Sequence, residues 1–294
     1  MDLRVLRYFL AVVREESISG AADFLHITQP TLSRQIMELE EELGVRLLNR
    51  GRKNHKITLT EEGALLRRRA EELIALADKT KSELSSSVEA VGGDVFIGGG
   101  ETEAIGLIAK AAGMVRGDHP NVCFHLYSGN GDDVTERLDS GLLDIGVFVG
   151  SVNLEKYHYI HLPVTDSWGL LTVKDSPPAR KRVIKAEDLK ELPLIASRQS
   201  MVFNELSGWC GCDFQSLSIV ATYNLIYNAS LMVEEGLGHA LCLEGLINTE
   251  GTDLRFIPLD PPLKVHLNVA WKKHRPLSKA AEKFLQRLQE LLRS

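Results

Sequence analysis

The chain has 294 residues, of which 44% are hydrophobic and 25% charged, and its formal net charge is −6 at pH 7. Its length suggests about two domains. No run approaches the ~18 apolar residues of a membrane span, and Arg4, Arg7 and Arg14 interrupt any signal-peptide pattern, so we expect a cytoplasmic protein without membrane contact. The acidic total does not exclude a nucleic-acid partner, because attraction to phosphate depends on where the cations lie.

Three short helices are predicted within the first 45 residues. Apolar residues at helical spacing from Leu3 to Val13 form the first. The second contains the small residues Gly20, Ala21 and Ala22, which allow close packing, and the segment Leu25-His26-Ile27 turns the chain.

The third predicted helix has the features of a DNA-recognition helix. Thr28 is expected to cap it with its hydroxyl, Pro30 is tolerated in its first turn, and Gly44 ends it. An apolar stripe predicts its buried side: Leu32, Ile36, Leu39 and Leu43. Short or forked polar side chains stand near its N-terminus, the end that such a helix presents to base edges. The candidate DNA contacts of this helix are Thr28, Gln29, Pro30, Thr31, Ser33 and Arg34.

The next segment, RLLNRGRKNHKITLTEEG, predicts two short strands that turn around residues 51–54. Between Arg46 and Lys56 it holds several cations and no acidic residue. This local positive charge suits contact with phosphate, despite the acidic total.

The stretch AADFLHITQPTLSRQIMELEEELGVRLLNR resembles the N-terminal domain of LysR-type transcriptional regulators. The match is close over roughly residues 3–63, and the overall pattern runs through the whole chain. The resemblance implies an N-terminal winged helix-turn-helix of predominantly α structure in residues 1–60, with promoter or operator DNA as its double-stranded partner. It also implies that the wing tip contacts the DNA backbone through Arg50, Arg52 and Lys53, and it makes RNA polymerase a candidate partner.

Residues 61–88 predict a long linker helix. Leu66, Ala70, Leu73, Ala77, Thr80, Leu84 and Val88 alternate at spacings of four and three, which is a narrow heptad seam. Such a seam needs a partner: the same helix of a second subunit, giving a homodimer, or the helix's own domain. The resemblance implies a homotetramer built from two such dimers.

After a Ser- and Gly-rich linker at 85–94, strands and helices alternate to the end of the chain. Strands are predicted near 95–100, 122–129, 142–150, 193–197, 218–224, 239–247, 255–259 and 264–273, and helices near 102–115, 132–139, 201–208, 225–235 and 278–292. Between the third and fourth of these strands, the apolar run at 160–173 leads toward a second unit. This order indicates an α/β domain with ligand sites at strand ends. The resemblance implies a two-lobed, periplasmic-binding-protein-like effector domain over 92–294. Lobe I would span about 92–163 and 266–294, lobe II about 164–265, with hinges near 163–167 and 264–270.

Polar and glycine residues at the predicted strand ends are the candidate ligands of a small-molecule effector. Exposed N–H groups at helix starts suit an anionic group, whereas Glu101, Asp132 and Asp133 at the same places leave a neutral or partly cationic effector open. Each residue could equally be an ordinary turn or cap residue. The candidates are Gly100, Glu101, Thr102, Ser128, Asn130, Phe148 as an apolar wall, Ser197, Gln199 and Asn224.

The sequence leaves two alternative functions. The C-terminal domain could only oligomerise, without an effector. The chain could be an α/β enzyme, but it lacks a G-x-S-x-G elbow, a phosphate loop and a dinucleotide fingerprint. We therefore expect no catalytic residue, no cofactor and no metal ligand. The four cysteines lack metal-ligand spacing along the sequence and are expected to be reduced thiols.

Overall fold

A computed structural model of the chain describes residues 1–49, 56–85, 91–150, 153–197, 205–213 and 216–293. It divides into two compact units, Met1–Ser85 and Ser86–Ser294. The wing tip at 50–55 and the linker at 86–90 lie outside the described residues, and so do the predictions that concern them.

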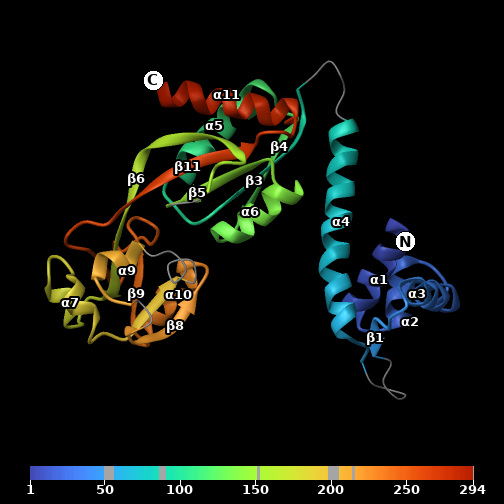
Figure 1. Cartoon of the computed structure of the whole chain (residues 1–294), viewed down its shortest axis with the longest axis horizontal. Helices are drawn as coiled ribbons and strands as arrows, with labels where there is room; N and C mark the ends of the chain where they lie inside the picture. Colours follow the sequence, from blue (N-terminus) through green and yellow to red (C-terminus); the bar gives the residue numbers. More distant parts are fainter. Residues whose placement is uncertain (50–55, 86–90, 151–152, 198–204, 214–215, 294) are drawn as a thin grey trace. The chain divides into compact units, whose positions relative to one another are not determined.

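The N-terminal unit is built on three helices, α1 (Leu3–Glu15), α2 (Ile18–Leu25) and α3 (Gln29–Leu43), as predicted. Their core contains Phe9, Val12, Ala21, Ala22, Leu32, Ile36 and Leu39. His26 ends α2 with a left-handed backbone (φ 55°), and its N–H donates to the carbonyls of Ala22 and Asp23. This fixes the tight turn that leads into α3 (Figure 1).

The apolar stripe of α3 is shorter than predicted. Leu32, Ile36 and Leu39 are buried, but Leu43 is 38% exposed. Gly44 ends the helix as predicted, with φ 68° and its N–H bonded to the carbonyls of Glu40 and Glu41.

The wing strands pair as predicted, as β1 (Leu48–Asn49) and β2 (Thr58–Leu59), antiparallel with Leu48 opposite Leu59. Helix α4 (Glu61–Ser85) begins directly afterwards. The Thr60 hydroxyl donates to the carbonyl of Arg46 (2.7 Å) and accepts the N–H of Gly63 (2.9 Å). A Cβ on Gly63 would lie 2.0 Å from the Leu47 carbonyl oxygen, so only glycine fits at this junction.

The seam of α4 is divided between its own unit and solvent. Ala70 is fully buried and Leu66 packs on the helical core, whereas Leu73 is 40% exposed. The Thr80 hydroxyl bonds to the Leu76 carbonyl of the same helix. Part of the seam therefore packs on its own domain, and part stays exposed to solvent.

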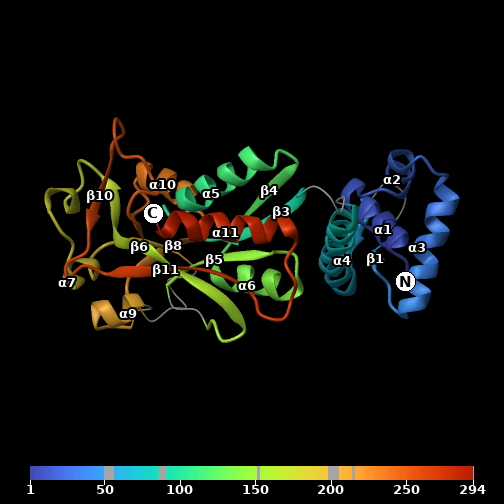
Figure 2. The same cartoon turned by 90° about the horizontal axis from the view of Figure 1, so that it is seen from above.

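Lobe I of the C-terminal unit is centred on parallel strands β3 (Gly93–Gly99), β4 (Val122–Ser128) and β5 (Ile145–Val149). Helices α5 (Ile105–Asp118) and α11 (Lys279–Arg293) bury one face of this sheet, and α6 (Gly131–Ser140) buries the other (Figures 1 and 2). Helix α5 begins three residues later than predicted, because residues 101–104 form a turn.

Two long strands connect lobe I to lobe II. Strand β6 (Tyr157–Val173) pairs with β11 (Lys264–Lys272) and then continues to pair with β9 (His239–Leu243) and β10 (Leu254–Pro258). Within the described residues, lobe II also contains the parallel strands β7 (Leu194–Ser197) and β8 (Ile219–Tyr223), with η1 (Pro178–Arg180), α7 (Ala186–Leu189), α9 (Glu205–Cys210) and α10 (Ile226–Glu234). The sheet order through the described residues is β4-β3-β5-β11-β6-β9-β7-β8.

Candidate functional site

The exposed face of α3 carries most of the predicted DNA contacts. Thr28, Gln29, Pro30, Thr31 and Arg34 are exposed, and Ser33 is partly buried. The only ion pair recorded for Arg34 within the described residues is with Glu38, at 3.6 Å and in solvent, so the guanidinium can be released at little cost. The candidate residues therefore form one polar surface at the start of a helix whose other side is fixed in the core.

The predicted role of Thr28 as a side-chain cap is wrong. Thr28 has the extended backbone of an N-cap residue (ψ 141°), but its side chain makes no capping bond. Its hydroxyl lies 2.8 Å from the Thr31 hydroxyl instead. Proline at the second helical position leaves one fewer N–H to cap, and one of the two hydroxyls donates to the other.

This difference predicts a contrast between two helix starts. Ser17 does cap α2, by accepting the N–H of Gly20 at 3.2 Å. We expect Ser17→Ala to lower the free energy of unfolding by about 1 kcal/mol. Thr28→Ala should lower it by only about 0.3 kcal/mol, because no side-chain cap is lost. Urea unfolding of the full chain, followed by circular dichroism, measures both. Equal losses would show that Thr28 caps α3 in solution.

The wing cations predicted to contact phosphate, Arg50, Arg52 and Lys53, lie outside the described residues. At the base of the wing, Lys56 is paired with Glu16, and the N–H of Ile57 bonds to the Glu16 carbonyl. The main-chain bond of Ile57 therefore fixes the base of the hairpin against the helical core, and the exposed Lys56–Glu16 pair adds little to it.

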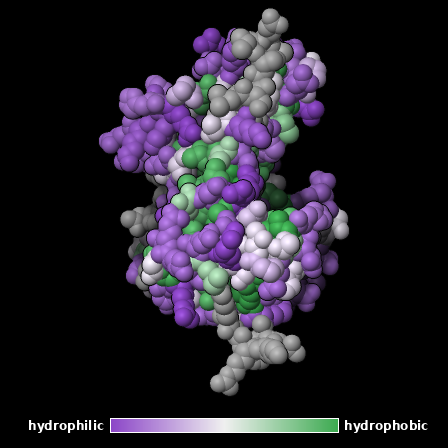
Figure 3. All heavy atoms as spheres, turned by 90° about the vertical axis from the view of Figure 1, so that its right-hand side faces the viewer, coloured by the Kyte–Doolittle hydropathy of each residue, from purple (hydrophilic) through white to green (hydrophobic). Residues whose placement is uncertain are grey.

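Apolar side chains are also exposed on the N-terminal unit. Phe24 is 54% and Leu65 53% exposed. Figure 3 shows apolar patches between hydrophilic side chains on the face of the molecule that it views.

In the C-terminal unit, Glu101 reaches from lobe I to lobe II. Its carboxylate accepts the N–H of Ile226, the first residue of α10, at 2.6 Å. Leu225 precedes that helix, and its apolar side chain cannot accept a capping hydrogen bond. Glu101 therefore provides the negative charge and the acceptor that a helix N-terminus requires, from 125 positions away in the sequence.

Thr102 and Glu103 extend this connection. The buried Thr102 hydroxyl donates to the carboxylate of Asp166 on β6 (2.6 Å) and accepts the N–H of Ala104 (3.1 Å). The Glu103 side chain packs against Gly245, just after β9, where a Cβ would lie 2.1 Å from a Glu103 carboxylate oxygen. We call Glu101, Thr102 and Glu103 the lobe-bridging segment.

Asp166 is a buried acidic side chain with a raised pKa. Burial raises its pKa, and the charge of Glu103 adds to this effect, whereas the hydrogen bond from Thr102 lowers it. Glu101 likewise affects its surroundings: burial raises the pKa of Cys242 to about 12, and the charge of Glu101 contributes.

Neutralising Asp166 is expected to stabilise the protein. Because the native pKa is raised, the folded chain holds this proton more tightly than the unfolded chain. Stability therefore falls as pH rises from the ordinary value of 3.8 to the raised one, and the loss persists above it. Asp166→Asn should raise the free energy of unfolding at pH 7 above that of the parent chain and flatten the acid part of the profile. Thermal unfolding at several pH values measures this, and lower stability of the variant at every pH would contradict it.

The other effector candidates lie in different environments. Gly100 follows β3, and Ser128 and Asn224 are exposed at the ends of β4 and beyond β8. Asn130 caps α6: its side chain accepts the N–H of Asp133, whose carboxylate accepts the Asn130 N–H. Ser197 ends β7, and Gln199 lies outside the described residues.

Phe148 needs a correction. Its ring is 1% exposed and lies in the lobe I core with Val134, Leu138 and Tyr157, so it is not an exposed pocket wall in this structure. Conversely, sequence reasoning missed Asp166, Glu103 and Ile226. Thr102 contacts Asp166, Glu101 contacts Ile226 and Glu103 contacts Gly245. Each contact joins positions far apart in the chain, and no local sequence pattern marks them.

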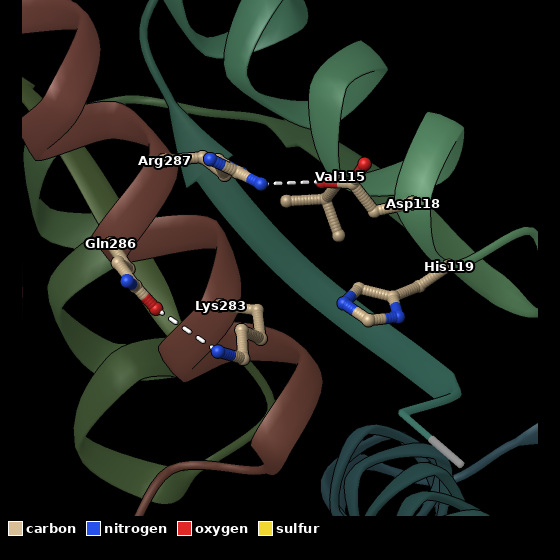
Figure 4. A pocket seen from close by; sticks show the side chains of 6 residues that line it. All are labelled: Val115, Asp118, His119, Lys283, Gln286 and Arg287. Atoms are coloured by element: carbon tan, nitrogen blue, oxygen red, sulfur yellow. Dashed lines mark hydrogen bonds and ion pairs between the residues drawn. The ribbon is translucent and has the colours of Figure 1, made fainter.

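A small polar hollow of about 80 Å³ lies between α5 and α11 (Figure 4). Arg287 donates to Asp118 at 2.6 Å and to Glu290, and Lys283 donates to Gln286 at 3.1 Å. Because these cationic groups are engaged within the fold, we assign no ligand to this hollow.

The four cysteines are free thiols in the structure. The sulfur atoms of Cys210 and Cys212 lie 2.7 Å apart. Burial and the neighbouring thiol raise the pKa of Cys210, which disfavours its reactive thiolate form.

Residues 3–64 match the family model of bacterial regulatory helix-turn-helix proteins of the lysR family, and residues 89–293 match that of the LysR substrate binding domain. The uncharacterized HTH-type transcriptional regulator YwbI of Bacillus subtilis is 32% identical over 296 residues, covering 99% of this chain and 97% of that protein. The transcriptional regulator BenM of Acinetobacter baylyi is 40% identical over 146 residues, covering 50% of this chain and 47% of BenM.

The solved structures agree in fold. CbnR in complex with its target DNA superposes with a TM-score of 0.75 at 19% identity, covering 99% of each chain. Full-length BenM gives 0.57 at 26% identity, covering 99% of this chain and 96% of that one. None of the helices in the described part of this chain has the length and apolar content that a membrane crossing needs. The chain therefore belongs to the LysR family of transcriptional regulators, in which a DNA-binding helix-turn-helix is joined to an effector-binding domain.

Proposed function

We propose that the chain binds a promoter or operator through the N-terminal part of α3, and that a small molecule bound between lobes I and II changes this binding. The observation that carries the DNA-binding part is the division of α3: Leu32 and Ile36 are fully buried, while Gln29, Thr31 and Arg34 face solvent. A helix fixed on one side and polar on the other can enter the major groove without rearrangement.

We assign base reading to Gln29, Thr31, Ser33 and Arg34, further DNA contacts to Thr28 and Pro30, and phosphate contacts to Arg50, Arg52 and Lys53. Residues 1–60 would form the DNA-binding domain. The solved complex of CbnR with its target DNA supports DNA as the partner, since the two chains share a fold.

For the effector we propose a position beside the lobe-bridging segment. The exposed Ser128 and Asn224, with Gly100, Asn130, Ser197 and Gln199, are the remaining candidates. A ligand there changes DNA binding only if it binds one arrangement of the lobes better than another. Because Glu101 already occupies the N-terminus of α10, an anionic effector would have to displace it, which favours a neutral or cationic group at that position.

We further propose that residues 61–88 pair two subunits, that residues 92–294 form the effector domain, and that dimers join into tetramers. The 40% exposure of Leu73 and the 53% exposure of Leu65 on α4 support a partner for this helix. RNA polymerase would respond to the assembly on DNA, and we assign the chain no catalytic role of its own.

The test is binding of the purified full chain to DNA from immediately upstream of its own gene, at two salt concentrations, followed by selection from random DNA. We expect a retarded complex that survives competitor DNA and a sequence motif with two related half-sites, because a symmetric dimer reads a symmetric site. Failure to select any motif from random DNA would refute DNA recognition by α3.

A further inference from the structure

Three potential metal ligands come together on the sheet of lobe I, at its β4 edge. In the parallel pair of β3 and β4, Asp94 lies opposite Cys123 and Phe96 opposite His125. Residues two apart on a strand share a face, so Cys123 and His125 project to the same side. The carboxylate oxygen, the thiol sulfur and an imidazole nitrogen lie within 4.8 Å of one another.

The scaffold holds two of these side chains in position. The His125 ring stacks on Phe96, with centroids 4.7 Å apart and planes at 16°. Its Nε2 lies 3.0 Å from an Asp94 carboxylate oxygen. Ligands on paired strands, with side chains fixed by packing, lose little freedom when an ion binds.

The donor set selects a class of ion. Thiolate sulfur and imidazole nitrogen suit zinc and similar transition metals, whereas calcium and magnesium require oxygen ligands throughout. We propose that Asp94, Cys123 and His125 bind a divalent transition metal ion of the zinc type. Three protein ligands leave a fourth tetrahedral position for water, and the exposure of Cys123 and His125 gives the ion access.

The alternative is a histidine hydrogen-bonded to an aspartate beside an unrelated thiol. The two differ in the role of Cys123: a metal must displace its proton and bind its sulfur, whereas the hydrogen bond between Asp94 and His125 needs no thiol. The proposal is independent of the effector and of DNA binding, because it uses neither α3 nor the lobe-bridging segment.

The test is titration of the full chain, freed of metal by a chelator, with Co²⁺ as a spectroscopic probe and Zn²⁺ as competitor. We expect one Co²⁺ per chain, with the ultraviolet charge-transfer absorption of a cobalt–thiolate bond, displaced by Zn²⁺. Cys123→Ser should abolish that absorption, and His125→Ala should weaken binding about tenfold or more. Circular dichroism checks that each variant is folded.

Cys212→Ser is the matched control, because it removes a different thiol and should leave the absorption intact. Absorption that survives Cys123→Ser but is lost in Cys212→Ser would place the ion at the Cys210–Cys212 pair and overturn the proposal. Absence of thiolate absorption in the parent chain would overturn it as well.

Discussion

Replacing Arg34 by alanine should weaken binding to the selected DNA sequence by about 1–3 kcal/mol and relax the base preference at one position of each half-site. Arg34 stands on the exposed side of α3, with 68% of its side chain accessible. A forked guanidinium can donate two hydrogen bonds to one guanine edge, which alanine cannot replace. The measurement is fluorescence anisotropy on the selected site and on variants changed at single positions.

A control separates base reading from general attraction. Arg116→Ala removes the same charge from an exposed position on α5, in the C-terminal unit, and should leave the sequence preference unchanged. A phosphate contact contributes to the salt dependence for every sequence, whereas a base contact contributes only where the preferred base is present. If Arg34→Ala weakened binding to all sequences equally and reduced the salt dependence, Arg34 would be a phosphate ligand.

The helix-turn-helix could be predicted in detail because its signals are local. The stripe of α3, the proline in its first turn and Gly44 at its end all lie within 17 positions, counted from Thr28 to Gly44. Two details differ from the prediction. Leu43 is exposed because it lies at the end of the helix, and the Thr28 hydroxyl bonds to Thr31 instead of capping the helix. Helical spacing alone indicates neither.

The continuous strand β6 was harder to predict. Pro163 interrupts its apolar pattern, and a proline cannot donate to a neighbouring strand. In the structure the pairing with β11 shifts register between His266 and Asn268, opposite this proline. The register shift therefore places Pro163 where no N–H is needed for pairing, and β6 can continue as one strand through both lobes.

Candidate effector residues were predicted from strand ends alone. This explains why Glu101 and Thr102 were placed correctly where the lobes meet and why Phe148 was not expected in the core. Glu101 and Thr102 do lie where the lobes meet, but their partners Ile226 and Asp166 are brought there by the tertiary fold. Phe148 was misplaced because β5 is buried on both faces, so alternation along the strand does not mark an exposed side.

Replacing Glu101 by alanine should separate the start of α10 from lobe I. The variant loses an acceptor 2.6 Å from the Ile226 N–H and a negative charge at a helix start that has no other side-chain cap. A hydrogen bond to a charged group contributes about 1.5–3 kcal/mol, so we expect a comparable loss of stability. Hydrogen exchange measured by mass spectrometry should report faster exchange in peptides covering the first turn of α10.

Glu101→Gln is the matched variant, because its side-chain oxygen can still accept the Ile226 N–H without the charge. It should keep most of the protection at α10, while the lost charge lowers the pKa of the Cys242 thiol. If the bridge sets the balance between two lobe arrangements, Glu101→Ala should also change DNA affinity in the absence of any effector, since it removes a contact made in only one of them. Unchanged exchange at α10 in Glu101→Ala would show that the bridge is not formed in solution. Faster exchange with unchanged DNA affinity would leave the bridge as a structural support without influence on the DNA-binding unit.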